Sequence, residues 1–194
     1  MTTPVQDKAA SQGWQKPVAT ALLVLADGTV IEGFGLGATG TSVGEVCFNT
    51  AITGYEEILT DPSYSGQIVT FTFPHVGNVG TNEEDIETVN MAADSGIRGV
   101  IVHAQISEPA NHRATRHFDQ WLKARKIVGM CGLDTRALTA LIREKGMPNA
   151  VIAHSPDGKF DIAALKKQAK EWPGIDGMDL VPGVTTAQTY KWNE

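Results

Sequence analysis

The glycines of the stretch GLGATG, at Gly35–Gly40, have the Gly-x-Gly-x-x-Gly spacing of a dinucleotide-binding turn. Such a turn needs a long helix directly after it, because the N-terminus of that helix binds the pyrophosphate. The residues that follow are TSVGEVCFNT, which are mostly β-branched or turn-forming and have poor helix propensity. The sequence therefore predicts a connection between strands, in which glycine permits positive φ angles, and argues against a dinucleotide-dependent enzyme.

The hydrophobic patterns along the chain predict an α/β domain. In the first half, two β-rich runs flank the turn pair Asp27-Gly28, and VGEVCFNT and QIVTFTFP are typical of two further strands. The second half predicts short strands in IRGVIVHA and IVGMCG, and helices in TRHFDQWLKARK, LDTRALTALIREKG and DIAALKKQAKEW. Asp134 is expected to cap the second of these helices, and Gly146 is expected to end it.

Composition excludes several classes of protein. A net charge of -6 and a pI near 5.3 provide no basic footprint for nucleic acid or for an anionic membrane surface. Cys47 and Cys131 are too few for a disulfide framework or a zinc site, and the histidines show no metal-ligand spacing. The apolar runs are too short to span a membrane, and the first residues lack the apolar core of a signal peptide. We therefore expect a cytoplasmic protein without metal, cofactor or membrane contact.

Cys131 lies between a predicted strand and a predicted helix, where glutamine amidotransferases hold a nucleophilic cysteine in a Gly-x-Cys-x-Gly turn. Gly129 fits this pattern, but Leu133 stands where the second glycine belongs. His154, further along, is followed by Ser-Pro and therefore supplies no base paired with a carboxylate. We interpret Cys131 as a small buried hydrophobic residue rather than a nucleophile.

Residues 44–82 carry an unusual density of polar and turn-forming side chains. Loops of this kind, held by rigid strands, are where binding residues usually lie. Residue types alone leave two interpretations open, a loop-borne site and an ordinary interface, and Asp61-Pro62-Ser63 is in itself a common turn signal. Glu56 and Glu57 are adjacent, so on a helix their carboxylates point apart rather than forming a pair. The acidic run NEEDIE, at 82–87, is typical of the solvated first turn of a helix.

Several of these segments together resemble the small, glutamine-hydrolysing subunit of carbamoyl phosphate synthetase. The resemblance begins in ALLVLADGTVIEGFGLGATG and continues through GEVCFNTAITGYEEILTDPSYSGQIVTFTFPHVGNVG. It then returns in IRGVIVHAQISEPANHRA, GLDTRALTALIREKG and WPGIDGMDLVPGV. It extends over residues 19–192, and the agreement of five separate blocks in the same order makes it specific.

The resemblance implies the N-terminal domain of that subunit, a swivelling β/β/α domain that packs against a C-terminal glutaminase domain and against the large subunit. In the family, the glutaminase hydrolyses L-glutamine with a Cys–His–Glu triad, and ammonia travels internally to the large subunit. There bicarbonate, ammonia and two ATP give carbamoyl phosphate for arginine and pyrimidine synthesis. The resemblance further implies that Ser63 contacts glutamine and that Asp61 lies near the start of the ammonia route.

The same resemblance predicts how the chain is organised: a flexible extension over 1–18, the β/β/α domain over 19–175, and the start of a linker over 176–194. The glutaminase would begin where the sequence stops, at Glu194, so no catalytic residue is assigned and this fragment of a ligase is expected to be inactive alone. The chain departs from the family at His103 and His112, positions often filled by arginine and by an aromatic residue. The alternative is a free-standing protein-binding module that has the same fold.

Overall fold

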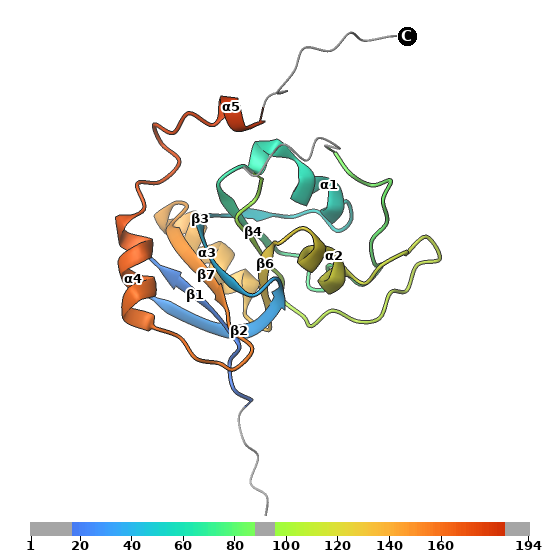
Figure 1. Cartoon of the computed structure of the whole chain (residues 1–194), viewed down its shortest axis with the longest axis horizontal. Coiled ribbons are helices and arrows are strands. Elements are labelled where there is room, and N and C mark those ends of the chain that lie inside the picture. The colour runs from blue at the N-terminus through green and yellow to red at the C-terminus, as the bar shows by residue number, and fades with distance from the viewer. Residues whose placement is uncertain (1–16, 88–95, 185–194) are drawn as a thin grey trace, which may run out of the picture.

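The computed structural model describes residues 17–87 and 96–184; Figure 1 draws the others in grey. Most of the predicted N-terminal extension (1–16) and the end of the predicted linker (185–194) lie outside the described residues. The described strands are β1 (Ala21–Leu25), β2 (Val30–Gly37), β3 (Gly40–Asn49), β4 (Gln67–Phe71), β5 (Gly99–Ile101), β6 (Val128–Cys131) and β7 (Asn149–His154). The described helices are α1 (Tyr55–Thr60), the short 3-10 helix η1 (Pro62–Tyr64), α2 (Phe118–Ala124), α3 (Thr135–Lys145), α4 (Ile162–Glu171) and α5 (Val181–Val184).

The described strands close into a barrel in the order β1-β2-β6-β5-β4-β3-β7 (Figure 1). Neighbouring strands are parallel along β3, β4, β5 and β6, and antiparallel at the other pairs. Parallel neighbours need a crossover between them, since a tight turn can only reverse the chain. The crossover from β3 to β4 contains α1 and η1, and it becomes important below.

The barrel interior forms one of three hydrophobic clusters. Each described strand contributes at least one side chain that points into the barrel. These side chains are Leu23, Ile31, Val46, Ile68, Ile101, Met130 and Ile152. Leu138 and Ile142 of α3 join the same cluster, so α3 covers one end of the barrel. The alternate residues of the strands point outward, as the period of two requires, and are covered by the other helices.

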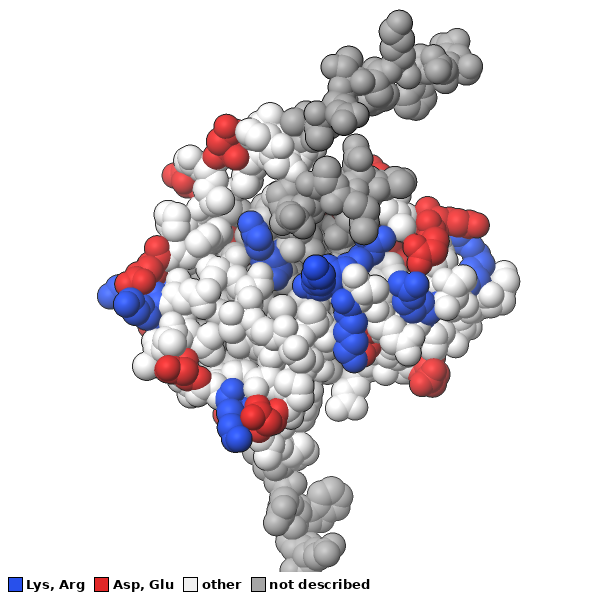
Figure 2. All heavy atoms as spheres, in the orientation of Figure 1, with Lys and Arg blue, Asp and Glu red and all other residues white. Residues whose placement is uncertain are grey.

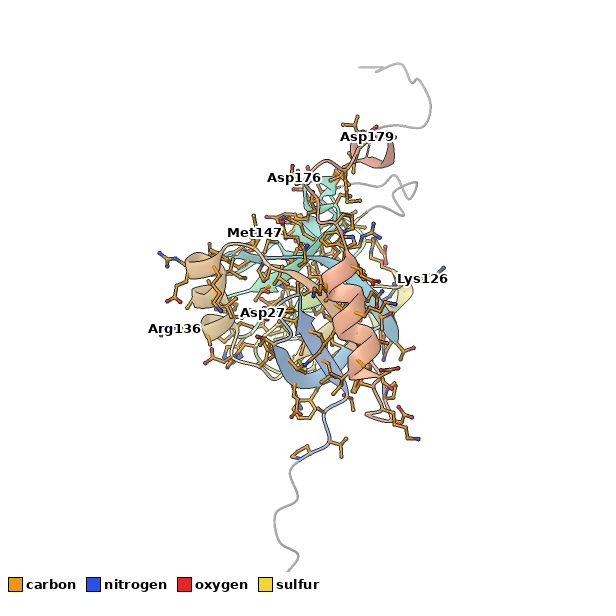
Figure 3. All side chains as sticks on the ribbon, turned by 90° about the vertical axis from the view of Figure 1, so that its left-hand side faces the viewer. Asp27, Lys126, Arg136, Met147, Asp176 and Asp179 are labelled. Carbon is orange, nitrogen blue, oxygen red and sulfur yellow. The ribbon has the colours of Figure 1, made fainter. Side chains whose placement is uncertain are left out.

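Helices cover the outside of the barrel on two sides. Phe118, Trp121 and Leu122 of α2 and Tyr55 and Leu59 of α1 pack together over β4, β5 and β6. On another side, Leu165 and Ala169 of α4 pack on β1 and β7, and Figure 3 shows α4 lying across that face. The helices predicted in TRHFDQWLKARK and DIAALKKQAKEW are thus confirmed as α2 and α4. So is the cap of α3, where the Asp134 side chain accepts the Ala137 N–H at 2.9 Å.

The structure corrects the sequence-based prediction in two places. Strand β7 was not predicted, although it lies between β1 and β3 and closes the barrel. Residues 82–87 are bends rather than the start of a helix. Their acidic side chains form ion pairs with Arg113 and Arg116, and the Asn82 N–H donates to Glu56 of α1. The α/β class holds, with a closed mixed barrel at its centre.

The GLGATG stretch forms the end of β2 and the start of β3, with no helix after it, so the dinucleotide interpretation is excluded. Gly35 is needed for a close approach: a Cβ atom there would lie 1.9 Å from the ring of His154. Gly37 has a positive φ of 69°, and a Cβ atom there would lie 2.3 Å from the Ile127 carbonyl oxygen. The glycines therefore serve packing and turning, as predicted from their flanks.

Charge and helix length complete the description of the surface. Figure 2 shows basic side chains gathered over the region of α2, although the net charge of the chain is -6. The sequence supplies Lys123, Arg125 and Lys126 there, and the Arg125 guanidinium lies 4.5 Å from the ring centroid of Trp121. The longest described helix, α3, has 11 residues. A membrane span needs about 20 apolar residues, so no described helix could cross a bilayer.

Candidate functional site

The crossover between β3 and β4 is built around a rigid turn at Asp61-Pro62-Ser63. The Asp61 side chain caps η1 by accepting the Ser63 N–H at 2.7 Å, and Pro62 occupies the first helical position, where its fixed φ is favourable. The Tyr64 N–H donates to the Asp61 carbonyl at 3.1 Å. Two side chains and a backbone bond thus hold a turn of only three helical residues.

Ser63 is the exposed member of this turn. Within the described part of the chain, its hydroxyl group makes no hydrogen bond, whereas its N–H is held by Asp61. The neighbouring Tyr64 is tied to the end of β3 by a 2.9 Å bond from the Asn49 side-chain amide to its hydroxyl. The arrangement therefore presents a free serine hydroxyl on a backbone fixed at both sides, which suits it to bind a polar ligand.

Helix α1, directly before this turn, is held through Tyr55 to the loop at Gly80 and to α2. The Tyr55 hydroxyl donates a short hydrogen bond to the Gly80 carbonyl oxygen. Its ring packs edge-to-face on Phe118 of α2, with 5.0 Å between the ring centroids. Tyr55 is buried, and burial raises the pKa of its hydroxyl above the usual range, so it remains a hydrogen-bond donor at neutral pH.

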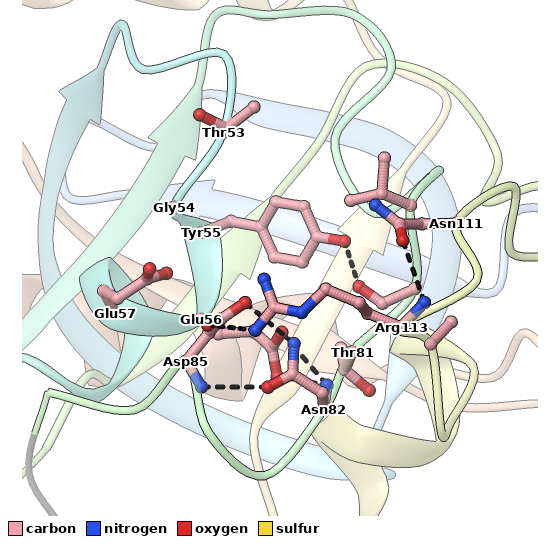
Figure 4. Close-up of a pocket in the computed structure, with 13 residues that line it drawn as sticks. Thr53, Gly54, Tyr55, Glu56, Glu57, Thr81, Asn82, Asp85, Asn111 and Arg113 are labelled. Carbon is pink, nitrogen blue, oxygen red and sulfur yellow. Dashed lines mark hydrogen bonds and ion pairs between the residues drawn. The ribbon is translucent and has the colours of Figure 1, made fainter.

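A pocket of about 190 Å³ lies beside the N-terminal end of α1 (Figure 4). Its walls come from α1 with the residues before it, from the 79–85 stretch and from the 111–114 loop. Asn82 organises one wall, because its side-chain oxygen accepts the N–H groups of Glu84 and Asp85 at 2.8 and 2.9 Å. Arg113 joins the other wall to the same residues, at 3.2 Å from Glu84 and 3.1 Å from Asp85.

Glu56 is a buried carboxylate at this pocket, with only 4% of its surface exposed. Its two oxygens accept the Asn82 N–H at 3.1 and 3.2 Å (Figure 4). Burial raises the pKa of Glu56 to about 7, and the nearby charges of Asp85 and Glu57 act in the same direction. The Asn82 N–H and Arg125 oppose this shift. Sequence reasoning treated Glu56 and Glu57 alike as residues of a solvated helix and missed that Glu56 is buried.

The other candidates behave as structural residues. Cys131 is buried, and burial raises the pKa of its thiol to about 11, so it is not an activated nucleophile. His103 bonds through Nδ1 to the Leu133 carbonyl at 2.8 Å, and His112 is exposed. Among the described residues, no group of three or more His, Cys, Asp or Glu side chains could hold a metal ion.

The comparisons with known proteins agree with one another. The model of the carbamoyl-phosphate synthase small chain, CPSase domain, matches residues 23–152. The carbamoyl phosphate synthase small chain of Bradyrhizobium diazoefficiens is 71% identical over 181 residues, which are 93% of this chain and 46% of that protein. The protein of the same name from Rhizobium meliloti is 65% identical over 185 residues, covering 95% of this chain and 46% of that protein.

The solved structures add little. An aminopeptidase from Aneurinibacillus aligns with a TM-score of 0.40 and 16% identity, over 70% of this chain and 30% of that one, which is too weak to support an argument. The curated relatives are far more similar, and this chain spans about half of their length. The match of the family model to most of the barrel, at this level of identity, shows that the chain belongs to the carbamoyl-phosphate synthase small chain family.

Proposed function

We propose that this chain is the N-terminal domain of the small subunit of glutamine-dependent carbamoyl phosphate synthase. It acts architecturally: it docks to the large subunit and to a glutaminase domain, and it borders the L-glutamine site and the ammonia route. Its fold is the swivelling β/β/α domain over 19–175, followed by a linker from 176, and its location is the cytoplasm. The observation that carries this proposal is the fixed turn that presents the free hydroxyl of Ser63.

The chemistry of the turn supports separate roles for its two polar residues. A serine hydroxyl donates one hydrogen bond and accepts others, so Ser63 can bind the polar groups of glutamine at the edge of a neighbouring domain. Asp61 accepts the Ser63 N–H, so its carboxylate lies directly beside the proposed glutamine contact. This position supports its assignment to the start of the ammonia route. Neither role needs a metal or a cofactor. Catalysis itself belongs to the glutaminase and to the large subunit.

Replacing Ser63 with alanine tests the glutamine contact. In the assembled synthase, with the small chain at full length, Ser63→Ala is expected to raise the KM for glutamine roughly 2- to 10-fold, the equivalent of one hydrogen bond of about 0.5–1.5 kcal/mol. The rate with free ammonia should stay unchanged, because ammonia enters after this contact. Ser63→Thr is the control, since it keeps a hydroxyl group. An unchanged glutamine KM in Ser63→Ala would remove Ser63 from the site.

Docking to the large subunit is tested separately. We expect this chain to co-elute with a purified large subunit of the same source at a defined ratio, measured by size-exclusion chromatography with light scattering. Co-elution would mean that the domain alone carries an important part of the docking surface. Separate elution would mean that docking depends on the glutaminase half, or that the chain is a free-standing binding module.

A further inference from the structure

Helix α1 depends on tertiary contacts for its position. It has only six residues, and Gly54 at its N-cap provides no side-chain hydrogen bond. Isolated helices shorter than about 12 residues are marginal in water, so α1 is held mainly by what packs against it. Its C-terminal residue, Thr60, is followed at once by Asp61, which ends α1 and begins the turn of Ser63. A shift of α1 would therefore move this turn directly.

The segment 82–87 contacts α1 at both ends. At the first end, the Asn82 N–H donates to both carboxylate oxygens of Glu56. At the second end, the Glu87 N–H donates to the Thr60 hydroxyl at 2.9 Å. That hydroxyl in turn donates to the Glu56 carbonyl at 2.7 Å, so both contacts converge on Glu56. Figure 4 shows Glu56, Asn82 and Asp85 together beside the pocket.

From this geometry we propose that Glu56 is a positioning residue for the Ser63 turn: it fixes segment 82–87 against α1, and the fixed helix sets the place of Ser63. The inference rests on the proposed function, since it concerns the affinity for glutamine, but it assigns a role that the turn itself does not reveal. Glu56 lies in the helix before the turn and bonds to segment 82–87, so its effect on the ligand is indirect.

The charges around Glu56 make this device sensitive to pH. Burial disfavours its charged form most strongly, and the charges of Asp85 in segment 82–87 and Glu57 on α1 add to this effect. The charge of Arg125, at the end of α2, and the Asn82 N–H act against it. Because the pKa of Glu56 is raised from 4.5 to about 7, the folded arrangement favours the neutral acid. The stability that neutral Glu56 gives to the folded arrangement is complete below about pH 4.5, the ordinary pKa, and is lost as the pH rises through about 7. Ionisation strengthens the bond from the Asn82 N–H, but it also places a buried negative charge beside Asp85 and Glu57. The second effect is the larger, so ionisation of Glu56 opposes the packing of α1 against segment 82–87.

The test uses Glu56→Ala, Glu56→Gln and Ser63→Ala in the full-length small chain assembled with the large chain. Glu56→Ala is expected to raise the glutamine KM several-fold at every pH, with the ammonia-dependent rate unchanged. Glu56→Gln keeps a side-chain oxygen for the Asn82 N–H and cannot ionise. For the unmodified protein we expect the KM to rise between about pH 6 and about pH 8, as Glu56 ionises. Glu56→Gln is expected to keep the low KM over this whole range.

Glu57→Gln is the matched control, because it removes a charge from the same turn of α1 but leaves the buried carboxylate in place. Hydrogen exchange gives an independent readout: exchange of residues 55–60 and 82–87 should be faster in Glu56→Ala and unchanged in Glu57→Gln. If Ser63→Ala raises the KM but both Glu56 variants match the unmodified enzyme at all pH values, the positioning role is wrong and the proposed function stands. If Ser63→Ala has no effect, the proposed function fails and this inference fails with it.

Discussion

Replacement of Phe118 by alanine is expected to lower the free energy of unfolding by about 3–5 kcal/mol, the range for deleting a buried aromatic ring. Phe118 is fully buried at the start of α2, between the ring of Tyr55 at 5.0 Å and the stacked ring of Trp121 at 6.1 Å. Its ring contacts Tyr55 directly and so joins α1 to α2. Its removal leaves a cavity and also frees the helix before the Ser63 turn.

Urea unfolding followed by circular dichroism measures this loss. Phe160→Ala is the matched control, because Phe160 is only partly buried and packs on the separate cluster under α4. We expect a clearly smaller loss for Phe160→Ala, since less surface is removed from the interior. Equal losses for the two variants would contradict the central place of Phe118. The near-ultraviolet signal of the aromatic cluster should change in Phe118→Ala alone.

The second large effect is expected for Gly37→Ala, which should destabilise the fold by roughly 2–4 kcal/mol. The backbone of Gly37 has φ 69°, which costs an L-residue about 1 kcal/mol or more. The new Cβ atom would also lie 2.3 Å from the Ile127 carbonyl oxygen, and overpacking of this kind typically adds about 1–3 kcal/mol. The Gly37 N–H donates to Asp119 at 2.8 Å, so the backbone cannot shift without losing that bond.

Gly146→Ala separates the two contributions. Gly146 also has a positive φ, of 86°, but a Cβ atom there meets nothing within 4 Å. Its substitution should therefore cost only the backbone strain, about 1 kcal/mol, in the same urea experiment. If Gly37→Ala lowered the free energy of unfolding no more than Gly146→Ala, the close approach of the Ile127 carbonyl would not contribute to the loss of stability. A larger loss for Gly37→Ala would confirm that β2 and the Ile127 backbone meet at van der Waals contact.

Much of the fold was predictable because local chemistry and tertiary structure agree. The caps at Asp134 and Gly146 lie where short polar side chains and positive φ angles are needed. The strand of residues 149–154 was missed even though AVIA is a continuous apolar run after Pro148. Its role comes from pairing with β1 on one side and β3 on the other, and such long-range pairing leaves no local pattern.

The candidate site was less predictable from the residues alone. Their types indicated a loop-borne site or an interface around Asp61-Pro62-Ser63, and only the family resemblance gave the individual roles. The burial of Glu56 could not be foreseen, because a glutamate on a short helix is usually solvated. It is buried because the chain returns to the same helix at Asn82, 26 positions later in the sequence. The helix expected at 82–87 is not formed, and the polar groups of this segment bond instead to Glu56 and Arg113, which are distant in the sequence.

The place of β7 in the ring has a consequence for synthesis of the chain. Both β1 and β3 pair with β7, and β7 is the last of the seven described barrel strands to be translated. Until Asn149–His154 has emerged, a nascent chain exposes two strand edges and an open interior, although most of the barrel has already been translated. Closure is therefore a late step of folding, and it joins parts of the chain that are distant in the sequence.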